Sequence, residues 1–322
     1  VQEMRRGGTT GACAAAAARS AYTALIENEF PDPVVITLPG GQRPSFALAR
    51  HTLRNGVAEA AIIKDAGDDP DVTHGALVVV RVRLLNAGEG VRFRAGEGIG
   101  TVTREGLELD VGEPAINPAP RRMIVAEVAD VAAAHSVSPD VEVEIAIPGG
   151  EQLAKKTLNG RLGIVDGLSV LGTTGVVIPF SCSAWIHSIH RSIDVARAAG
   201  IEHAAAATGS TSELAVKTLY NLPEEALIDM GDFAGGTLKY IRRHPIRRLT
   251  IAGGFAKLGK LGAGLLDLHS KRGRIDLNWM AGCAASSGAS ALLVKDIREA
   301  ETAGRALQIA KVADFPIGEI VA

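Results

Sequence analysis

Residues 58–85 read AEAAIIKDAGDDPDVTHGALVVVRVRLL, in which two apolar runs flank a loop that carries four aspartates within seven positions. The runs at 58–63 and 76–85 predict two strands, and the partial alternation in the second is typical of a half-buried strand. Gly67 and Pro70 predict a shaped turn between them. Because like charges this close repel, an acidic loop held between two core strands indicates a binding or catalytic edge.

Outside this unit, the first half of the chain is rich in short strands. Helices are predicted at 12–29 and at 118–134, where prolines open the second one. The remaining predicted strands are 34–38, 46–53, 91–94 and 141–147. Strands outnumber helices, which is the α+β pattern.

After about Gly160, short apolar runs alternate with helical stretches. The predicted strand–helix pairs are 176–179 with 184–199, 201–208 with 211–220, 226–230 with 234–243, and 249–252 with 256–268. Repeated units of this length predict an α/β, Rossmann-like domain with a parallel sheet, which binds ligands at the carboxyl ends of its strands. We therefore expect an α+β domain over residues 1–155 and an α/β domain over residues 156–322.

The composition argues against several classes of protein. The 322 residues include 34 basic and 36 acidic side chains, and only 4% are aromatic, so nucleic acid is not an expected partner. Cys13, Cys182 and Cys283 lie far apart without a CxxC pair, which argues against a disulfide framework and favours a cytoplasmic protein. No run approaches the roughly 20 apolar residues that span a bilayer, so no membrane association is expected.

The segment Arg6-Gly-Gly-Thr-Thr-Gly11 leads directly into the first predicted helix. Free N–H groups and the helix dipole at that point favour a carboxylate or phosphate. The alternative is that Thr9 or Thr10 simply caps the helix. Cys13, in the first turn, has either a lowered thiol pKa or the role of a small buried residue.

Glycines follow three predicted strands of the second half, at Gly209, Gly231 and Gly253. A glycine there lets a ligand approach the backbone, and the carboxylate of Asp232 could bind ribose hydroxyls. The alternatives are local: Ser210 and Glu213 have the spacing of a capping box, and Asp232 could be an N-cap. The full dinucleotide fingerprint is absent.

Metal binding has little support in the sequence. His187, His190 and His269 lack the surrounding residues of a known ligand set, so no metal site is expected. The acidic loop could bind a divalent cation through its aspartates, although its spacing differs from the EF-hand pattern.

Several long motifs, taken together and in order, resemble the CbiD family, the cobalt-precorrin-5B C1-methyltransferases of cobalamin biosynthesis. The motifs are RGGTTGACAAAAA (6–18), KDAGDDPDVTHG (64–75), GIGTVT (98–103), GEPAINP (112–118), LGTTG (171–175), GDF (231–233) and HS (269–270). The sequence departs from the family pattern at Gly8, Ala12, Ser210 and Leu268.

The resemblance implies transfer of a methyl group from S-adenosylmethionine to C1 of cobalt-precorrin-5B, giving cobalt-precorrin-6A. The expected carboxylate partners of the tetrapyrrole are Arg6, Thr9, Thr10, Lys64, Arg121 and Arg122. The expected nucleoside site comprises Gly209, Glu213, Asp232 and Gly253. The candidates for handling a ring proton are Asp65, Asp68 and His74. The first domain would then hold the tetrapyrrole and the second the methyl donor.

Two other functions stay open at this point. One is a different nucleotide-dependent tetrapyrrole enzyme, such as a nicotinamide-dependent reductase, and the other is a non-catalytic tetrapyrrole carrier. Neighbouring enzymes of corrin synthesis and a second copy of the chain are further conceivable partners, and the sequence does not decide between them.

Overall fold

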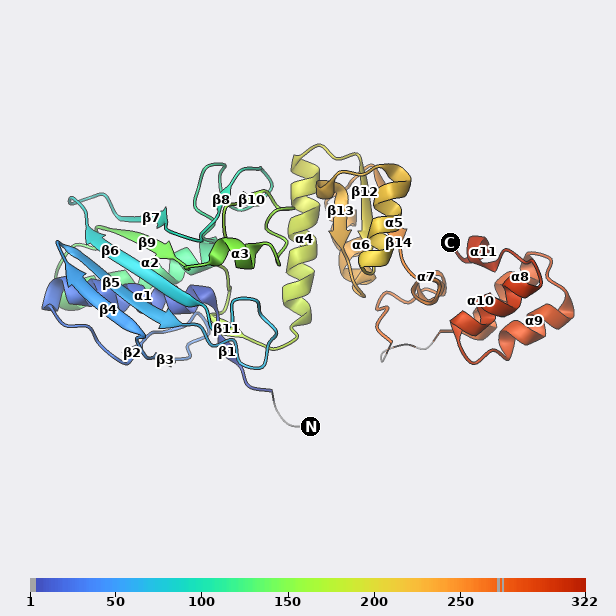
Figure 1. Ribbon diagram of the computed structural model, residues 1–322, viewed down its shortest axis with the longest axis horizontal. Coiled ribbons are helices and arrows are strands. Elements are labelled where there is room, and N and C mark those ends of the chain that lie inside the picture. The colour runs from blue at the N-terminus through green and yellow to red at the C-terminus, as the bar shows by residue number, and fades with distance from the viewer. Residues whose placement is uncertain (1–3, 271–272, 274) are drawn as a thin grey trace. The chain divides into compact units, whose positions relative to one another are not determined.

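The computed structural model describes residues 4–270, 273 and 275–322. The chain forms two compact units, which divide between Ser181 and Cys182 (Figure 1). We call them unit 1 and unit 2. The boundary predicted at residues 155 and 156 falls inside unit 1.

Two short strand pairs explain why unit 1 extends beyond the predicted boundary. β10 (Ile164–Val165) pairs antiparallel with β8 (Thr101–Val102). β11 (Val176–Val177) pairs antiparallel with β1 (Gly7–Gly8). Strands that follow residue 156 thus complete pairs with strands that precede it.

A five-stranded mixed sheet forms the centre of unit 1. Its strands lie in the order β4-β5-β6-β9-β7, and only β7 and β9 run parallel. The strands are β4 (Arg50–Arg54), β5 (Val57–Ile63), β6 (Leu77–Leu84), β7 (Val91–Ala95) and β9 (Val141–Ala146). The two strands that flank the acidic loop are therefore β5 and β6, as predicted.

Helices α1 (Thr10–Glu27) and α2 (Pro118–His135) pack on one face of this sheet, and α1 lies against α2, β5 and β6 (Figure 1). The side chains from Ala12 to Ala18 are at most 1% exposed. Because alanine presents only a methyl group, the helix can approach its neighbours on all sides. The alanine run therefore builds the core of unit 1.

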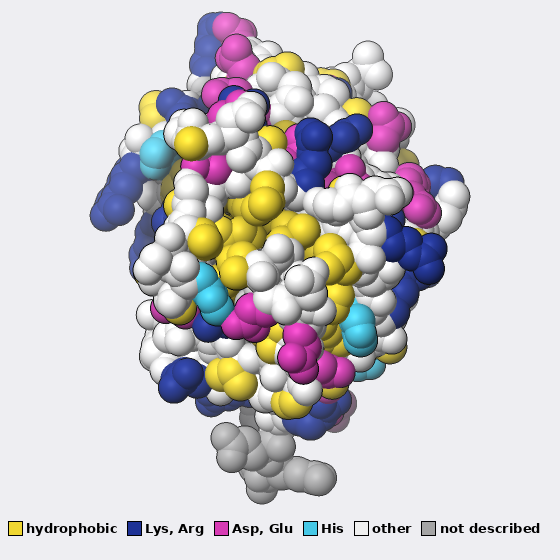
Figure 2. All heavy atoms as spheres, turned by 90° about the vertical axis from the view of Figure 1, so that its left-hand side faces the viewer, with side chains coloured by type: hydrophobic (Ala, Val, Ile, Leu, Met, Phe, Trp, Pro, Cys, Tyr) yellow, Lys and Arg dark blue, Asp and Glu magenta, His cyan; other side chains and the backbone are white. Residues whose placement is uncertain are grey.

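The other face of the sheet carries charged side chains. Arg81 bridges Glu59 (2.8 Å) on β5 and Glu144 (2.6 Å) on β9, its direct cross-strand neighbours. In β6, Val78, Val79, Val80 and Val82 are buried while Arg81 and Arg83 are not, which confirms the predicted half-buried strand. Figure 2 shows one end of unit 1, where basic and acidic side chains are interspersed around a mainly hydrophobic hollow.

The single strand predicted at 46–53 is divided in the structure. β3 (Ser45–Phe46) pairs with β2 (Val34–Val35), while β4 belongs to the main sheet. Residues 47–49 between them line a cavity. A short helix, α3 (Gly150–Ala154), follows β9.

Unit 2 contains a three-stranded parallel sheet in the order β13-β12-β14. Its strands and helices are α4 (Cys182–Ala198), β12 (His203–Ala207), α5 (Ser210–Tyr220), η1 (Glu224–Ala226), β13 (Leu227–Asp229), α6 (Ala234–Arg243), β14 (Arg248–Ala252) and α7 (Phe255–Gly262). Ala204 and Ala206 of β12 belong to a core cluster with residues of α4 and α6, whereas Ala205 packs with α5. Three strands support a parallel α/β arrangement, but not the finer description as Rossmann-like.

Two predictions in the second half of the chain need correction. The strand predicted at 176–179 is not part of the parallel sheet, because β11 pairs with the N-terminal β1 instead. The helix predicted at 256–268 ends at Gly262, after which the chain folds back toward α6 through the bond from Gly235 N–H to Leu266 O (2.8 Å).

Among the described residues that follow α7, four helices have no counterpart in the sequence predictions. They are α8 (Leu277–Ser286), α9 (Ala291–Arg298), α10 (Ala303–Val312) and α11 (Ile317–Val321). They share a separate core cluster that includes Met280 and Ile297. Throughout the described residues, no helix has the length and apolar character needed to cross a membrane.

The packing of α1 gives a direct prediction. We expect Ala16→Leu to lower the free energy of unfolding of unit 1 by about 1–3 kcal/mol, because the added methylenes have no space between the sheet and α2. Urea unfolding followed by far-ultraviolet circular dichroism measures the change. The exposed Ala134→Leu on α2 is the control and should change little. Equal stability of the two variants would contradict the packing argument.

Candidate functional site

The acidic loop, residues 64–75, binds the N-terminal segment of the chain. The guanidinium of Arg5 contacts both carboxylate oxygens of Asp65, at 3.0 Å for the Nη2–Oδ1 pair. The backbone N–H of Arg5 donates to Asp68 Oδ2 (2.6 Å). Gly67 lies so close to this segment that a Cβ on it would be 2.1 Å from Arg5 O, and its φ of +69° also favours glycine. The loop thus fixes the residues that precede α1.

The other two aspartates of the loop also have partners. Lys64 is 2% exposed, and its Nζ donates to Asp71 Oδ2 and to Thr73 Oγ1. Asp69 Oδ1 accepts the backbone N–H of Phe180 (2.9 Å). Each carboxylate therefore faces a cation or an N–H donor, which offsets the repulsion among the four charges.

The ionisation of Asp65 follows from these contacts. Hydrogen bonds from Arg5 and from the Gly67 N–H lower the pKa of Asp65 from 3.8 to about 2. Asp65 is thus a stable anion at neutral pH and unsuited to act as a general base. His74 has a different arrangement, because its Nδ1 accepts the Ala66 N–H (3.1 Å). In the neutral ring, Nε2 then carries the proton.

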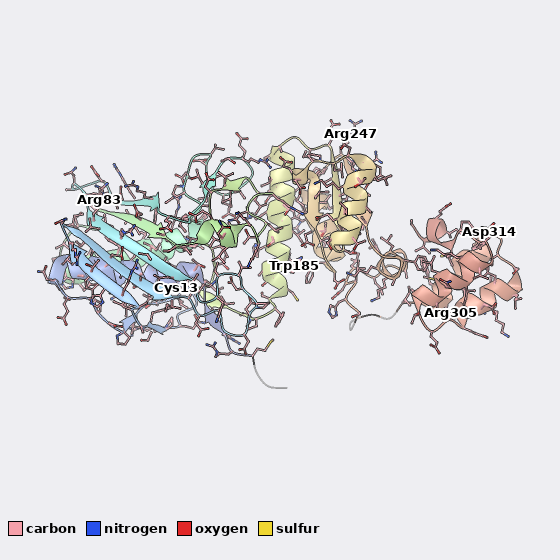
Figure 3. All side chains as sticks on the ribbon, viewed as in Figure 1. Cys13, Arg83, Trp185, Arg247, Arg305 and Asp314 are labelled. Atoms are coloured by element: carbon pink, nitrogen blue, oxygen red, sulfur yellow. The ribbon has the colours of Figure 1, made fainter. Side chains whose placement is uncertain are left out.

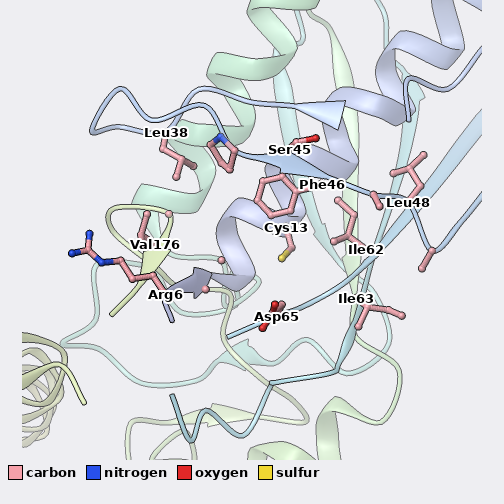
Figure 4. Close-up of a pocket in the computed structure, with 16 residues that line it drawn as sticks. Arg6, Cys13, Leu38, Ser45, Phe46, Leu48, Ile62, Ile63, Asp65 and Val176 are labelled. Atoms are coloured by element: carbon pink, nitrogen blue, oxygen red, sulfur yellow. The ribbon is translucent and has the colours of Figure 1, made fainter. Parts of the chain in front are cut away.

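A cavity of about 540 Å³ adjoins the loop. Figure 4 shows Phe46, Ile62 and Cys13 grouped around it, with Asp65 nearby and the side chain of Arg6 extending away from the hydrophobic side chains. Arg6 is exposed and forms no ion pair with the described residues. The cavity therefore combines apolar walls with a cation at its rim.

Other predicted site residues of unit 1 have structural roles. Thr9 Oγ1 accepts the Ala12 N–H (3.1 Å) and caps α1, and Thr10 is 3% exposed. Arg121 donates to Ile116 O (2.8 Å) and pairs with Glu113 (2.7 Å). These three side chains and Lys64 do not line the cavity.

Cys13 lines the cavity, but its side chain is buried. Burial raises the pKa of Cys13 to about 12, so the thiol is protonated at neutral pH. Of the two alternatives that the sequence left open for this residue, the structure supports the small buried side chain.

In unit 2, the loops that follow the three strands come together at one edge of the sheet. Thr208 N–H donates to Ala252 O (2.9 Å), and Gly231 N–H donates to Ala207 O (3.1 Å). A Cβ at Gly253 would be 3.0 Å from the side chain of Thr208. The structure thus brings the predicted residues Gly209, Asp232 and Gly253 to the same edge.

Neither of the local roles considered for these residues is present: Ser210 and Glu213 do not form a capping box, and Asp232 is not an N-cap. Gly209, not Ser210, is the N-cap of α5, and no side chain caps this helix. Glu213 lies in the first turn of α5, where its N–H donates to Gly209 O (3.0 Å). Phe233, not Asp232, is the N-cap of α6.

Asp232 forms an incomplete set of contacts. Its Oδ1 lies 2.9 Å from Lys257 Nζ, but the ion pair is not aligned as a hydrogen bond, and this buried oxygen has no hydrogen-bond donor among the described residues. Lys257 Nζ donates instead to Thr208 O (3.1 Å). The Asp232 side chain as a whole is 23% exposed, so its carboxylate can accept a further hydrogen bond from a ligand.

The histidines do not form a metal centre. His190 stacks on Tyr240, with ring centroids 3.8 Å apart, and His187 meets His190 edge-on at 6.3 Å. In the part of the chain that the structure describes, no three His, Cys, Asp or Glu side chains are grouped so that they could hold a metal ion.

Comparison with known proteins decides the family. The CbiD family profile matches residues 1–179, and the profile of the CbiD C-terminal domain matches residues 267–322. The chain belongs to the CbiD family. Among its relatives are two proteins named cobalt-precorrin-5B C(1)-methyltransferase. The one from Bradyrhizobium sp. is 62% identical over 99% of this chain and 85% of the relative, and the one from Paramagnetospirillum magneticum is 59% identical over 100% and 89%.

A solved structure is also similar to this CbiD-family chain. It is a cobalamin biosynthesis protein (cbiD) from Archaeoglobus fulgidus, 28% identical, with a TM-score of 0.45 over 84% of this chain and 83% of that one.

In this CbiD-family chain, the motifs of unit 1 meet at the start of α1. The motif at 171–175 accepts two hydrogen bonds from the motif at 6–18: Gly11 N–H donates to Leu171 O (3.2 Å) and Thr9 N–H to Gly175 O (3.0 Å). Gly8 N–H donates to Asp65 O (2.8 Å), which joins the acidic loop to the same place. Arg5, which the sequence analysis did not single out, holds this junction together.

The pairing of Arg5 with Asp65 predicts a titration. The carboxyl of Asp65 should titrate near pH 2, and Arg5→Ala should raise its pKa toward 3.8. Because folding lowers this pKa, the stabilisation from the pair is present above pH 3.8 and is lost as the pH falls toward 2. Carboxyl NMR titration measures both values. Arg43→Ala, at an exposed arginine that does not line the cavity, should leave the Asp65 titration unchanged.

Proposed function

We propose that this chain transfers a methyl group from S-adenosylmethionine to C1 of cobalt-precorrin-5B, giving cobalt-precorrin-6A and S-adenosylhomocysteine. The observation that carries the proposal is the 62% identity, over almost the whole chain, to a relative named for this activity. Turnover of cobalt-precorrin-5B with labelled methyl donor, followed by location of the label on the ring, tests it. A label on another carbon, or none, would overturn it.

The nucleoside of the methyl donor binds at the carboxyl edge of the unit 2 sheet, in a Rossmann-like manner. The carboxylate of Asp232 supports this assignment, because it lies at this edge with its side chain 23% exposed and can accept a hydrogen bond from a ribose hydroxyl. Gly209 and Gly253 allow close approach to the backbone, and Glu213 follows in the first turn of α5. When bound, S-adenosylmethionine supplies an activated methyl group on a sulfonium, so the protein has only to orient the reactants and exclude water.

The tetrapyrrole binds at the cavity of unit 1. The macrocycle carries acetate and propionate groups, and Arg6 has a guanidinium that no carboxylate of the described chain neutralises. The apolar walls formed by Phe46, Leu48 and Ile62 suit the edge of the ring system. Lys64 and Arg121 do not bind the substrate in this proposal, because their donors are already used inside the protein.

Among the three candidates for proton transfer, His74 fits best. Its side chain is half exposed, and the neutral ring can take up a proton only at Nδ1, once the hydrogen bond from the Ala66 N–H has opened. Asp65 Oδ1 lies 3.8 Å from this nitrogen, so a carboxylate faces the proton that the ring would accept. Asp65 and Asp68 hold Arg5 and act as positioning residues in this proposal.

The nucleoside assignment gives a binding prediction. Asp232→Ala should weaken S-adenosylhomocysteine about 10- to 100-fold, because hydrogen bonds to a charged acceptor contribute about 1.5–3 kcal/mol. Isothermal calorimetry measures the affinity. Glu202→Ala removes an exposed carboxylate at the opposite edge of the same sheet and should have no effect. Unchanged binding in Asp232→Ala, together with lost binding in Asp65→Ala, would move the nucleoside to unit 1.

The tetrapyrrole assignment predicts a change in KM. Arg6→Gln should raise KM for cobalt-precorrin-5B about 10-fold while KM for S-adenosylmethionine stays the same, because only the tetrapyrrole carboxylate loses its charged partner. Steady-state kinetics with each substrate varied in turn separates the two constants. Arg43→Gln is the matched control, since it removes an exposed arginine that does not line the cavity. Equal KM values for Arg6→Gln and the parent protein would contradict the assignment.

A further inference from the structure

Trp185 is a large aromatic side chain that remains 46% exposed beside the proposed nucleoside site. The chain has only two tryptophans, Trp185 and Trp279, and both belong to unit 2. Figure 3 places Trp185 on the side of α4 that faces the sheet of unit 2. A tryptophan with a purely structural role would bury most of its surface, so this exposure calls for an explanation.

Several contacts fix the orientation of the Trp185 ring. Its Nε1–H donates to the backbone oxygen of Asp229, the last residue of β13 (3.2 Å). The ring lies over Gly231, where a Cβ would come within 3.4 Å of Nε1 and where φ is +55°. The ring of Phe233 lies next to it, with the centroids of the Trp185 and Phe233 rings 6.4 Å apart. A hydrogen bond and a glycine thus hold an exposed ring at the carboxyl end of β13.

The same loop carries Asp232, whose side chain pairs with Lys257 at 2.9 Å and is still 23% exposed. The segment from Gly231 to Phe233 therefore supplies a carboxylate that can accept a hydrogen bond from a hydroxyl group, and it also supports the oriented ring of Trp185. A purine nucleoside presents the complementary pair, a ribose with two hydroxyls next to a flat π system. Aromatic side chains stack on any base, because every base has a π face.

We infer that Trp185 stacks on the adenine of S-adenosylmethionine while Asp232 accepts a hydrogen bond from the ribose. This inference rests on the proposed function and adds to it a residue that no family motif contains. Trp185 contacts the co-substrate without taking part in bond making, so its contribution is to affinity and orientation. Its removal should raise KM for the methyl donor and leave KM for the tetrapyrrole unchanged.

Fluorescence gives the first test, because Trp279→Phe leaves Trp185 as the only tryptophan. Titration of this variant with S-adenosylhomocysteine should quench the remaining emission, with the same Kd as calorimetry gives for the parent protein. In Trp185→Phe the emission of Trp279 should not respond. Quenching confined to Trp279, or no quenching in either variant, would overturn the inference.

Two substitutions of Trp185 then separate the contribution of ring stacking from that of side-chain size. Trp185→Leu keeps an apolar side chain but removes the π face, and should weaken S-adenosylhomocysteine about 5- to 100-fold. Trp185→Phe keeps a π face and should bind within about threefold of the parent protein. Equal affinity of the Leu and Phe variants would reject stacking, and circular dichroism shows that each variant is folded.

The activity of the parent protein, compared with the KM of Trp185→Leu, distinguishes a failure of this inference from a failure of the proposed function. If the parent protein methylates cobalt-precorrin-5B but Trp185→Leu leaves KM for S-adenosylmethionine unchanged, the stacking role fails and the function stands. If the parent protein neither binds S-adenosylhomocysteine nor transfers methyl groups, both fail together.

Discussion

The close packing of α1 is the constraint on which the rest of unit 1 depends. From Ala12 to Ala18 the helix has almost no exposed surface, so its position between α2 and the sheet is fixed on every side. Its first turn and the residues just before it then form a rigid point to which two distant segments bind: the acidic loop, through Gly8, and the motif at 171–175, through Thr9 and Gly11. A helix of larger residues could not lie this close to the sheet, and the junction would lose its support.

The acidic loop shows how local charge repulsion can specify a long-range contact. Four aspartates within seven positions would destabilise an isolated turn, and each becomes favourable only when the chain supplies its partner. Those partners are Arg5, Lys64 and the N–H of Phe180, which lies 111 residues away from Asp69. The loop therefore forms fully only when the N-terminal segment and the chain around β11 are in place. This dependence also means that the carboxylates are already engaged and have little capacity left for a cation.

The sequence predicts the regularly patterned helices and strands of this fold well, but it predicts poorly which distant segments contact one another. β5, β6, α2 and α6 lie within a residue or two of their predicted bounds, because alternation, helical periodicity and proline placement are local signals. The antiparallel pairing of β11 with β1 depends on residues about 170 positions apart, and no local pattern reports such a partner. The boundary predicted near residue 155 lies before β11 for the same reason: no local pattern shows that β11 pairs with the N-terminal strand.

For the candidate site, too, the sequence predicts one part well and another part poorly. Glycines after three parallel strands predict a common edge, because the strand direction alone places their ends together, and the structure brings Gly209, Asp232 and Gly253 there. Residue type alone does not tell whether a polar side chain is free or already used. Thr9, Lys64 and Arg121 have the chemistry of substrate ligands, yet a cap, a buried ion pair and a set of carbonyls take up their hydrogen bonds.

The charges that remain after these internal contacts decide what each unit can bind. In unit 1, Arg5 neutralises Asp65, so the guanidinium of Arg6, which has no ion-pair partner among the described residues, gives the rim of the cavity a net positive charge that suits an acidic ligand. In unit 2, Asp232 pairs with Lys257 at 2.9 Å and is still 23% exposed, so its carboxylate can accept a hydrogen bond from a hydroxyl donor. An acid-rich macrocycle and a ribose differ in this same respect: the first brings acceptors and the second brings donors. The proposed sorting of two chemically different substrates therefore rests on the polar groups that folding leaves accessible in each unit.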